Sequence, residues 1–150
     1  MLPMTMTNAL LILDDFLPYR LSVTSNLVSE RIAQVYAALF ALTIPQWRLI
    51  AVMAEERAVT QQAICKRTHM DKVTVSRAAI ELVGRGLVSR SDNPEDKRSH
   101  LLSLTQQGHE LYVGVAPKAL EMERQIFETF SPKEASQLKA LLTKIEGALL

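Results

Sequence analysis

The sequence predicts a mainly α-helical fold with a small β wing, and two observations support this. Apolar residues recur at helical spacing toward both ends of the chain, over residues 16–42 and 106–149. Between them, residues 61–83 are typical of two short helices joined by a tight turn, and residues 87–104 of a hairpin around a charged loop. Two such helices followed by a hairpin form a winged helix-turn-helix. We therefore predict this fold as a single domain, with additional helices on both sides of the winged lobe.

Length and composition limit the class of protein. With 150 residues, 48% of them hydrophobic and 22% charged, the chain can bury a core and is unlike a disordered segment. No apolar run approaches the length of about 18 residues that a membrane span requires. Met1–Asn8 lacks the basic start of a signal peptide, and the single cysteine fits a reducing compartment. We expect a cytoplasmic protein with no membrane partner.

Basic residues gather in the middle of a nearly neutral chain. The net charge is only +1, yet residues 57–100 hold nine Lys or Arg against five Asp or Glu, a balance of +4. Uncompensated cations in one segment favour a polyanion such as nucleic acid, because they release its counterions. The alternative is a chance excess of charge on a solvated face.

The first helical stretch, residues 16–42, is long for a domain of this size. Pro18 lies near its start, where a missing amide proton costs least. At about 1.5 Å per residue the helix extends for about 35 Å, which is typical of a helix that spans two lobes or two subunits. The residues predicted to fall on one stripe of this helix are Leu21, Thr24 or Ser25, Val28, Ile32, Val35 and Leu39.

Each of the next three helices is predicted to begin at a capping residue. Gln46 stands three residues after Thr43, the spacing of a reciprocal capping box. The predicted caps and helices are Thr43 for residues 44–56, Thr60 for residues 61–69 and Asp71 for residues 72–83.

The helix predicted over residues 72–83 is apolar on one face and polar on the other. With Val75 at the centre of the buried face, a step of about 100° per residue keeps Ala79 and Leu82 close to it. The outward face then holds Val73, Thr74, Ser76, Arg77 and Ile80. Short polar side chains and an arginine suit a major groove, because they can bond phosphates and base edges. The alternative is an ordinary solvated helix face.

The hairpin predicted from strands 87–91 and 101–104 has Arg98 near its tip. An arginine in this position can enter the narrow minor groove of DNA, where the negative potential is deepest. Asp96 can hold the loop in shape by bonding the backbone or the arginine. The alternative is a charged hairpin that only protects its edge from aggregation.

Two further helices complete the chain, one from residue 106 to about residue 130 and one that begins after Ser131. The last helix has an apolar stripe too rich for the end of a monomer, and such patches usually mark an interface. We therefore predict that the first, fifth and sixth helices form a dimer bundle. The predicted parts are dimerisation segments at about residues 8–42 and 105–150 and a winged DNA-binding lobe at about residues 43–104.

Several motifs together resemble the MarR family. They are Gln46-Trp47-Arg48, Asp71-Lys72-Val73-Thr74-Val75-Ser76-Arg77, Leu87-Val88-Ser89-Arg90, Pro94-Glu95-Asp96-Lys97-Arg98-Ser99 and Leu104-Thr105-Gln106-Gln107-Gly108. The resemblance covers essentially the whole chain, and the wing motif Asp96-x-Arg98 followed by Leu-Thr-x-x-Gly is its most specific part. The chain departs from the family at Val73, where a serine is common, and this departure removes one possible phosphate bond.

The resemblance implies a homodimeric bacterial regulator that binds a palindromic, double-stranded DNA operator, and we expect a repressor. The expected DNA-binding residues lie in the two short helices and the wing. They are Thr60, Gln61, Thr68, Lys72, Val73, Thr74, Ser76, Arg77, Lys97 and Arg98. A winged-helix module that binds proteins and not DNA is the alternative.

The resemblance also implies a small-molecule effector that changes the spacing of the two DNA-reading lobes. Residues 16–22 resemble members that control aromatic-acid catabolism, so we expect an aromatic or phenolic acid or its coenzyme A thioester. The expected effector crevice includes Arg20, Leu21, Ser25, Trp47, Arg48 and His109. The alternatives are structural ion pairs for the two arginines and a core position for Trp47.

Chemistry at other sites is not expected. Three scattered histidines and one cysteine give no metal-ligand pattern, and no nucleophile-base-acid set or glycine-rich phosphate loop is visible. We therefore predict no enzyme, no cofactor and no metal. Cys65 could be a redox sensor, since Lys66 and Arg67 could lower its pKa, but a buried structural cysteine is the preferred interpretation.

Overall fold

Six α-helices and a three-stranded sheet make up the fold of the described residues, 9–150, in a computed structural model. The expectations for Met1–Asn8, including the first residue of the predicted dimerisation segment, lie outside these residues. The elements are η1 (Leu13–Asp15), α1 (Leu17–Phe40), α2 (Ile44–Glu56), β1 (Ala58–Val59), α3 (Gln61–Thr68), α4 (Lys72–Gly84), β2 (Val88–Asp92), β3 (His100–Leu104), α5 (Gln106–Ile126) and α6 (Pro132–Leu149). This order confirms the predicted winged helix-turn-helix with helices on both sides.

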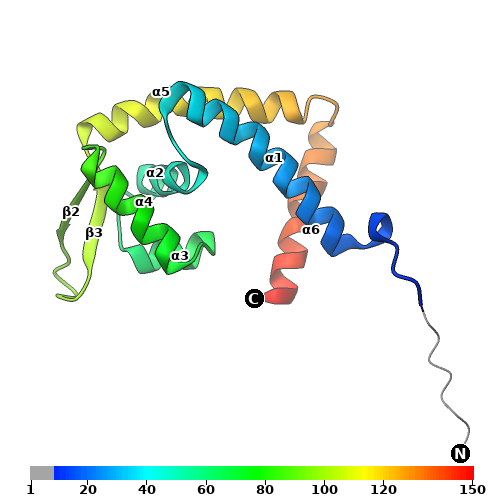
Figure 1. The fold of residues 1–150 in the computed structure, drawn as a ribbon, viewed down its shortest axis with the longest axis horizontal. Coiled ribbons are helices and arrows are strands. Elements are labelled where there is room, and N and C mark those ends of the chain that lie inside the picture. Colours follow the sequence, from blue (N-terminus) through cyan, green and yellow to red (C-terminus); the bar gives the residue numbers. More distant parts are fainter. Residues whose placement is uncertain (1–8) are drawn as a thin grey trace, which may run out of the picture.

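The elements form a lobe with an elongated extension (Figure 1). Helices α2, α3 and α4 and the hairpin β2–β3 lie together at one end, and α1 and α5 extend away from them. Helix α6 turns back from the far end of α5, apart from the winged lobe. The sheet is antiparallel with the order β1-β3-β2, and β2 pairs with β3 from Val88 opposite Leu104 to Asp92 opposite His100.

The core fills the winged lobe and the adjoining ends of α1 and α5. Apolar side chains from helices and sheet meet there without solvent contact, which is the largest favourable contribution to folding. The fully buried side chains of greatest volume are Leu42, Leu49, Ile50, Met53, Ile64, Leu82, Leu102, Val75 and Val115. The two short helices are therefore held as one body, and their outward faces keep a fixed relation to each other.

The predicted caps are confirmed. The Thr43 hydroxyl accepts a hydrogen bond from the backbone N–H of Gln46, and the Gln46 side chain accepts one from the backbone N–H of Thr43. Ser131 and Glu134 form the same reciprocal box at the start of α6. Thr60 caps α3 through the N–H of Ala63. These bonds satisfy amide groups that a helix start leaves free, and they explain why the helix starts were predictable.

A close contact joins the end of α4 to the start of α5. The Thr105 hydroxyl accepts a bond from the Gly108 N–H at 3.0 Å and donates one to the Gly86 carbonyl at 2.7 Å. A Cβ at position 108 would lie 2.0 Å from the Leu87 carbonyl oxygen, so only glycine fits there. This contact is a physical reason for the Leu-Thr-x-x-Gly motif.

One strand was not predicted, and the limits of the wing strands and of one helix differ from those predicted. Strand β1 was not predicted, because two residues that pair with Ser103 and Leu102 carry no alternating pattern. Strand β2 lies one residue closer to the loop than predicted, and β3 begins one residue earlier than predicted but ends at Leu104 as expected. Helix α5 ends at Ile126 and not near residue 130, since residues 127–129 form a turn in which the rings of Phe127 and Phe130 pack edge to face.

The first and last helices leave much apolar surface uncovered. Tyr36, outside the predicted stripe, is the buried residue of α1, whereas Leu21 and Leu39 on that stripe are exposed. Helix α6, which is described in full, has no buried residue, and Leu141 and Leu149 are 58% and 80% exposed. Within residues 9–150, no single helix is long and apolar enough to cross a membrane; α1 and α2 meet that test only together and are bent by 80° at their junction.

Candidate nucleic-acid interface

Helix α4 buries one face and presents the other, as predicted. Val75, Ala78, Ala79 and Leu82 are buried in the core. On the opposite side Val73 and Ile80 are 64% and 59% exposed, and Arg77 is also exposed. Thr74 and Ser76 are half-buried at the edges of this face. An exposed isoleucine and valine beside an arginine indicate a surface that contacts another molecule.

Asp71 fixes the start of α4 with both of its carboxylate oxygens. It accepts the backbone N–H of Thr74 at 2.7 Å and the Thr74 hydroxyl at 2.9 Å. The backbone N–H of Thr74, with a smaller contribution from its hydroxyl, lowers the pKa of the Asp71 carboxyl. Because the Thr74 hydroxyl proton is donated to Asp71, Thr74 shapes the helix start in this arrangement.

Replacing Asp71 with asparagine should lower the melting temperature at neutral pH, and the difference from wild type should shrink in acid. The folded pKa is depressed, so the stabilisation is present above the unfolded value of about 3.9 and is lost as the pH falls through the folded value. Thermal melts at pH 7 and near pH 3 measure this effect. A difference that stays constant over this range would show that the charge of Asp71 does not stabilise the helix start.

The wing loop between β2 and β3 is held by its own side chains. The Arg98 backbone N–H donates to the Asp96 carboxylate at 2.9 Å, and the Asn93 amide donates to the Ser99 hydroxyl at 3.0 Å. Asp96 was predicted to shape the loop by bonding either the backbone or the arginine side chain, and the bond to the backbone N–H of Arg98 confirms the first of these. Arg98 and Lys97 are exposed on this ordered loop. The guanidinium of Arg98 is thus carried by a loop whose backbone is already shaped.

Two adjoining grooves unite α3, α4 and the wing into one surface, which we call the basic face. The first groove, about 600 Å³, is lined by Gln61, Lys72, Val73, Ser76, Arg77, Ile80 and Glu81. The second, about 360 Å³, is lined by Thr60, Gln61, Gln62, Ser76, Ile80, Arg90, Arg98, Ser99, His100 and Leu102. Gln61, Ser76 and Ile80 border both grooves. The cations on this face can hold phosphates while the hydroxyls, amides and apolar side chains meet base edges.

Most predicted DNA-binding residues meet on the basic face, and three lie elsewhere. Thr74 and Lys97 line neither groove. Thr68 lines a separate cavity, and its hydroxyl donates to the Ile64 carbonyl at 2.7 Å. A phosphate oxygen can only accept hydrogen bonds, so a contact from Thr68 would require this internal bond to break.

The sequence reasoning missed the contributions of Arg90 and His100 to the second groove, whereas Ile80 was predicted on the outward face of its helix. Arg90 and His100 lie on the two paired wing strands, whose register places Asp92 opposite His100. The His100 imidazole lies 3.9 Å from the Asp92 carboxylate. The alternation of side chains along the strand showed that Arg90 must lie on one face of the hairpin. It did not show which face of the hairpin is turned toward α4.

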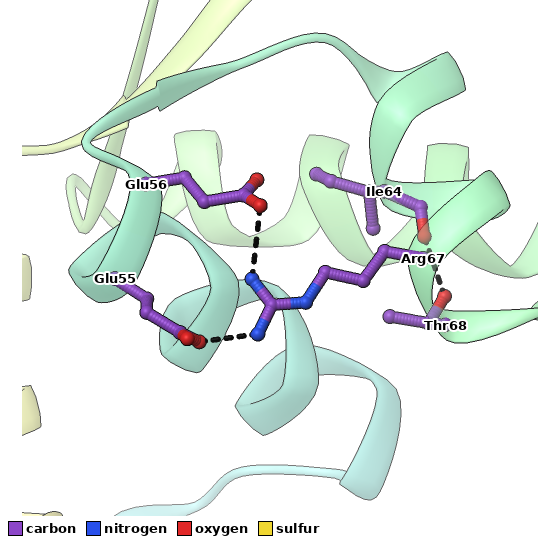
Figure 2. Close-up of polar contacts among 5 residues, drawn as sticks. All are labelled: Glu55, Glu56, Ile64, Arg67 and Thr68. Carbon is purple, nitrogen blue, oxygen red and sulfur yellow. Dashed lines mark hydrogen bonds and ion pairs between the residues drawn. The ribbon is translucent and has the colours of Figure 1, made fainter. Parts of the chain in front are cut away.

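Arg67 is basic but is paired with acidic side chains outside the basic face. Figure 2 shows its guanidinium between Glu55 and Glu56 at the end of α2, bonded to Glu55 and, at 3.0 Å, to Glu56. The hydrogen bond to Glu55 is the main reason that the pKa of Arg67 is raised. These acids lie just outside the basic segment counted in the sequence, so Arg67 joins α3 to α2 and its charge is locally compensated.

Three aromatic rings meet where α1, α2 and α5 converge, and we call them the aromatic cluster. The Trp47 ring lies 5.2 Å from that of Tyr36 and stacks at 5.9 Å on that of Tyr112. Burial raises the pKa of the Tyr36 hydroxyl. Trp47 and Arg48 also line a cavity of about 280 Å³ with Thr68 and Arg67. Tyr36 and Tyr112 were missed, because no pattern in the sequence links the helices that carry them.

The other predicted effector residues do not join this cluster within one chain. Ser25 and Arg20 are 11 and 16 residues before Tyr36 on the same helix, which corresponds to about 16 and 24 Å. Arg20, Leu21 and Ser25 are exposed, and the Arg20 guanidinium donates to the Asp14 carbonyl at 3.0 Å. His109 is exposed one turn before Tyr112.

Two other predicted features have simple surroundings. Cys65 is half-buried, carries a free thiol and packs against the core, in keeping with its structural interpretation. Residues 9–150 hold no group of three or more His, Cys, Asp or Glu side chains that could bind a metal ion.

Comparison with known proteins identifies relatives of this chain. A model of the MarR family matches residues 42–99. The chain is 25% identical to transcriptional regulator HosA of Escherichia coli over 107 residues, which are 71% of this chain and 79% of HosA. It is 32% identical to the HTH-type transcriptional regulator YdcH of Bacillus subtilis over 99 residues, which are 63% of this chain and 67% of YdcH.

Solved structures share the fold over nearly the whole chain. A MarR/EmrR family transcriptional regulator from Acinetobacter sp. ADP1 has a TM-score of 0.85 at 27% identity, covering 93% of this chain and 98% of its own. Sco3205 of Streptomyces coelicolor, solved in complex with DNA, has a TM-score of 0.84 at 22% identity, covering 94% of both chains. BpsR of Bordetella bronchiseptica, whose DNA binding is regulated by 6-hydroxynicotinic acid, has a TM-score of 0.72 at 23% identity, covering 85% of this chain and 98% of BpsR.

Proposed function

The chain belongs to the MarR family of DNA-binding transcriptional regulators, and we propose that it is a homodimeric repressor released from its operator by a small aromatic acid or its coenzyme A thioester. Fold and family are those of regulators and not of enzymes. Because its partner is chromosomal DNA, we place the protein in the cytoplasm.

The basic face is the observation that carries this proposal. It joins Arg77 in the outward face of α4 to Arg98 at the wing tip through a continuous border of polar and apolar side chains. A helix with this face fits the major groove, and an arginine on a preshaped loop fits the adjacent minor groove. Contacts to base edges come from Val73, Ser76 and Arg77, contacts to phosphates come from Thr60, Gln61, Lys72 and Lys97, and Arg98 enters the minor groove.

Dimerisation explains the uncovered apolar surface. Leu17, Leu27, Leu141 and Leu149 are more than half exposed; they lie on α1, which extends away from the winged lobe, and on α6, which turns back from the far end of α5 (Figure 1). A second copy that covers these helices would remove this surface from water. We propose residues 8–42 and 105–150 as the dimerisation segments and residues 43–104 as the DNA-binding lobe.

A symmetric dimer requires a symmetric operator. Two copies of α4 would enter successive major grooves about one turn, or about 34 Å, apart. The operator should therefore be an imperfect palindrome of about 16 to 20 base pairs.

A mobility-shift titration with DNA from the region flanking the gene, at two salt concentrations, tests DNA recognition. A DNA reader must show a steep fall of affinity with salt, because each phosphate contact releases counterions. We expect specific binding at the lower salt concentration and a much weaker affinity at the higher one. Absence of binding at low salt would favour the alternative, a winged-helix module that binds proteins.

The effector is proposed from the aromatic cluster and from one relative. BpsR is regulated by 6-hydroxynicotinic acid, which is an aromatic acid. In this chain Trp47 offers an aromatic wall with Arg48 beside it, and Arg48 could pair with a carboxylate. Arg20, Leu21 and Ser25 could complete the crevice only if a partner subunit brings its α1 close, because they lie far along α1 from Trp47. His109 is exposed on α5, one turn before Tyr112.

A thermal-shift panel of aromatic acids and their coenzyme A thioesters tests this assignment. A ligand that binds only the folded protein raises the melting temperature by mass action. The effector should raise it and also weaken operator binding, which requires a difference of a few kcal/mol in its affinity for the two dimer geometries. A compound that raises the melting temperature without weakening operator binding would be a ligand but not the effector.

A further inference from the structure

The C-terminal end of α4 is hydrogen-bonded to the junction of α1 and α2. We call this junction the corner and define it as residues 40–46, which include the end of α1, the turn and the first residues of α2. Two polar contacts make this connection, one from Arg85 and one from Glu81. These residues follow Arg77 at intervals of four and so continue the same side of the helix: Glu81 still lines the larger groove of the basic face, and Arg85 lies beyond both grooves. Helix α4 thus presents the basic face along residues 72–81 and holds the corner through Glu81 and its C-cap, Arg85.

The Arg85 contact satisfies the end of α1. Its guanidinium donates to the Ala41 carbonyl at 2.8 Å and to the Phe40 carbonyl at 3.3 Å. The last carbonyls of a helix have no partner within the helix and carry partial negative charge, so a cation is well placed there. Ala41 itself has a left-handed backbone, with a φ of 51°, that ends α1. Arg85 also forms the C-cap of α4, so one residue joins the ends of two helices.

The Glu81 contact holds the other side of the corner. The Gln46 amide donates to the Glu81 carboxylate at 2.6 Å, while its oxygen accepts the Thr43 N–H at 3.1 Å. Gln46 is only 6% exposed and is the buried polar side chain of the described core. A buried amide with both ends engaged permits little adjustment, because loss of either bond leaves a polar atom without a partner.

The corner also adjoins the aromatic cluster. Trp47 follows Gln46 directly in α2, and Tyr36 lies one turn before Phe40 in α1. A change in how Trp47 packs between Tyr36 and Tyr112 would therefore act on both sides of the corner. Because the same corner is bonded to Glu81 and Arg85, it connects the aromatic cluster directly to α4.

We propose that Gln46, Glu81 and Arg85 are positioning residues that set the orientation of α4 on DNA, and that the corner passes the state of the aromatic cluster to α4. This inference rests on the proposed function, since it concerns how the same DNA-reading helix is regulated. Gln46 and Arg85 lie outside both grooves of the basic face and act on the operator through α4; Glu81 lines the edge of the larger groove, and its positioning role is the bond to Gln46.

Glu81→Ala and Arg85→Met test the proposal because they change the net charge in opposite directions. Kd values are measured for each variant with operator DNA and with a scrambled duplex of equal length. If charge alone matters, Glu81→Ala binds both duplexes more tightly, Arg85→Met binds both more weakly, and the ratio of the two affinities stays constant. If α4 is mispositioned, both variants should lower the operator-to-scrambled ratio, by about three- to tenfold. A ratio that is unchanged in either variant would overturn the proposal.

Two further variants separate positioning from stability and general charge. Arg85→Lys keeps a cation that can donate to the carbonyls of α1, so it should recover most of the ratio. Lys118→Met removes an exposed cation from α5 and should leave the ratio unchanged. Failure of Arg85→Lys to recover more of the ratio than Arg85→Met would contradict a role through the carbonyls.

A double-mutant cycle tests the link to the aromatic cluster. Tyr112→Leu removes one stacked ring and should lower the operator-to-scrambled ratio in the wild-type background. Its effect should be much smaller when combined with Glu81→Ala, because the route to α4 is already broken. Equal effects in both backgrounds would overturn the link. Lack of operator binding by the wild-type protein would instead refute the proposed function itself.

Discussion

Arg77→Ala is expected to lower operator affinity by about tenfold to a hundredfold, corresponding to about 1–3 kcal/mol. Arg77 is exposed at the centre of the outward face of α4 and lines the larger groove of the basic face. Its guanidinium fork can bond both acceptors of a guanine, and alanine offers no donor in their place. Fluorescence anisotropy with operator DNA and with operators substituted at single base pairs measures the loss of affinity and of preference.

Arg77→Lys is the matched variant for this prediction. Lysine retains the charge but presents a compact point cation instead of a planar fork, so it can hold a phosphate as well but meets the two guanine acceptors in a poorer geometry. If Arg77 reads a base, the lysine variant should keep the salt dependence and lose discrimination at one position of the operator. If Arg77→Ala binds the operator as tightly as wild type, the wrong face of α4 has been assigned to the groove.

Replacing Leu141 and Ile145 of α6 with aspartate is expected to lower operator affinity even more than Arg77→Ala does. Leu141 and Ile145 are 58% and 40% exposed and occupy one side of α6. Aspartates at both positions would place unpaired charges in the proposed dimer interface, which is costly. The double variant should be monomeric by sedimentation. It should lose operator affinity by about a thousandfold or more, toward the level of non-specific binding, because a monomer reads only one half-site.

Thr143→Asp provides the control for this experiment. Thr143 is on the opposite side of α6, where its hydroxyl bonds the Lys139 carbonyl at 3.0 Å, and the substitution adds the same type of charge. It should remain dimeric and bind the operator normally. A double variant that is monomeric yet binds the full operator with wild-type affinity would separate DNA recognition from dimerisation and refute the proposed symmetric reading.

Features set by neighbouring residues could be predicted from the sequence. The caps at Thr43, Thr60 and Asp71 depend on residues within the first turn of each helix, and each was confirmed. The buried face of α4 followed from helical periodicity, which the core imposes on any helix lying against it. Arg98 at the wing tip and the role of Asp96 followed from the composition of one short loop.

Features that depend on distant contacts could not be predicted in this way. Arg85 bonds a carbonyl 44 residues away and Gln46 a carboxylate 35 residues away, and no local pattern encodes such pairs. Strand β1 exists only because β3 offers it a partner. The aromatic cluster is assembled from three helices, so Tyr36 and Tyr112 were recognisable only once those helices had been placed. The count of charges in residues 57–100 also overstated the free positive charge, because Arg67 pairs with Glu55 and Glu56 just outside that segment.

A change in operator spacing tests most directly the claim that two copies of α4 read successive major grooves. Insertion of about five base pairs between the half-sites turns one of them to the opposite side of the duplex, because B-DNA repeats every 10 to 10.5 base pairs, or about one turn. Anisotropy titrations should show affinity for the altered operator reduced to the level of a single half-site. Equal affinity for the original and the altered operator would contradict the account.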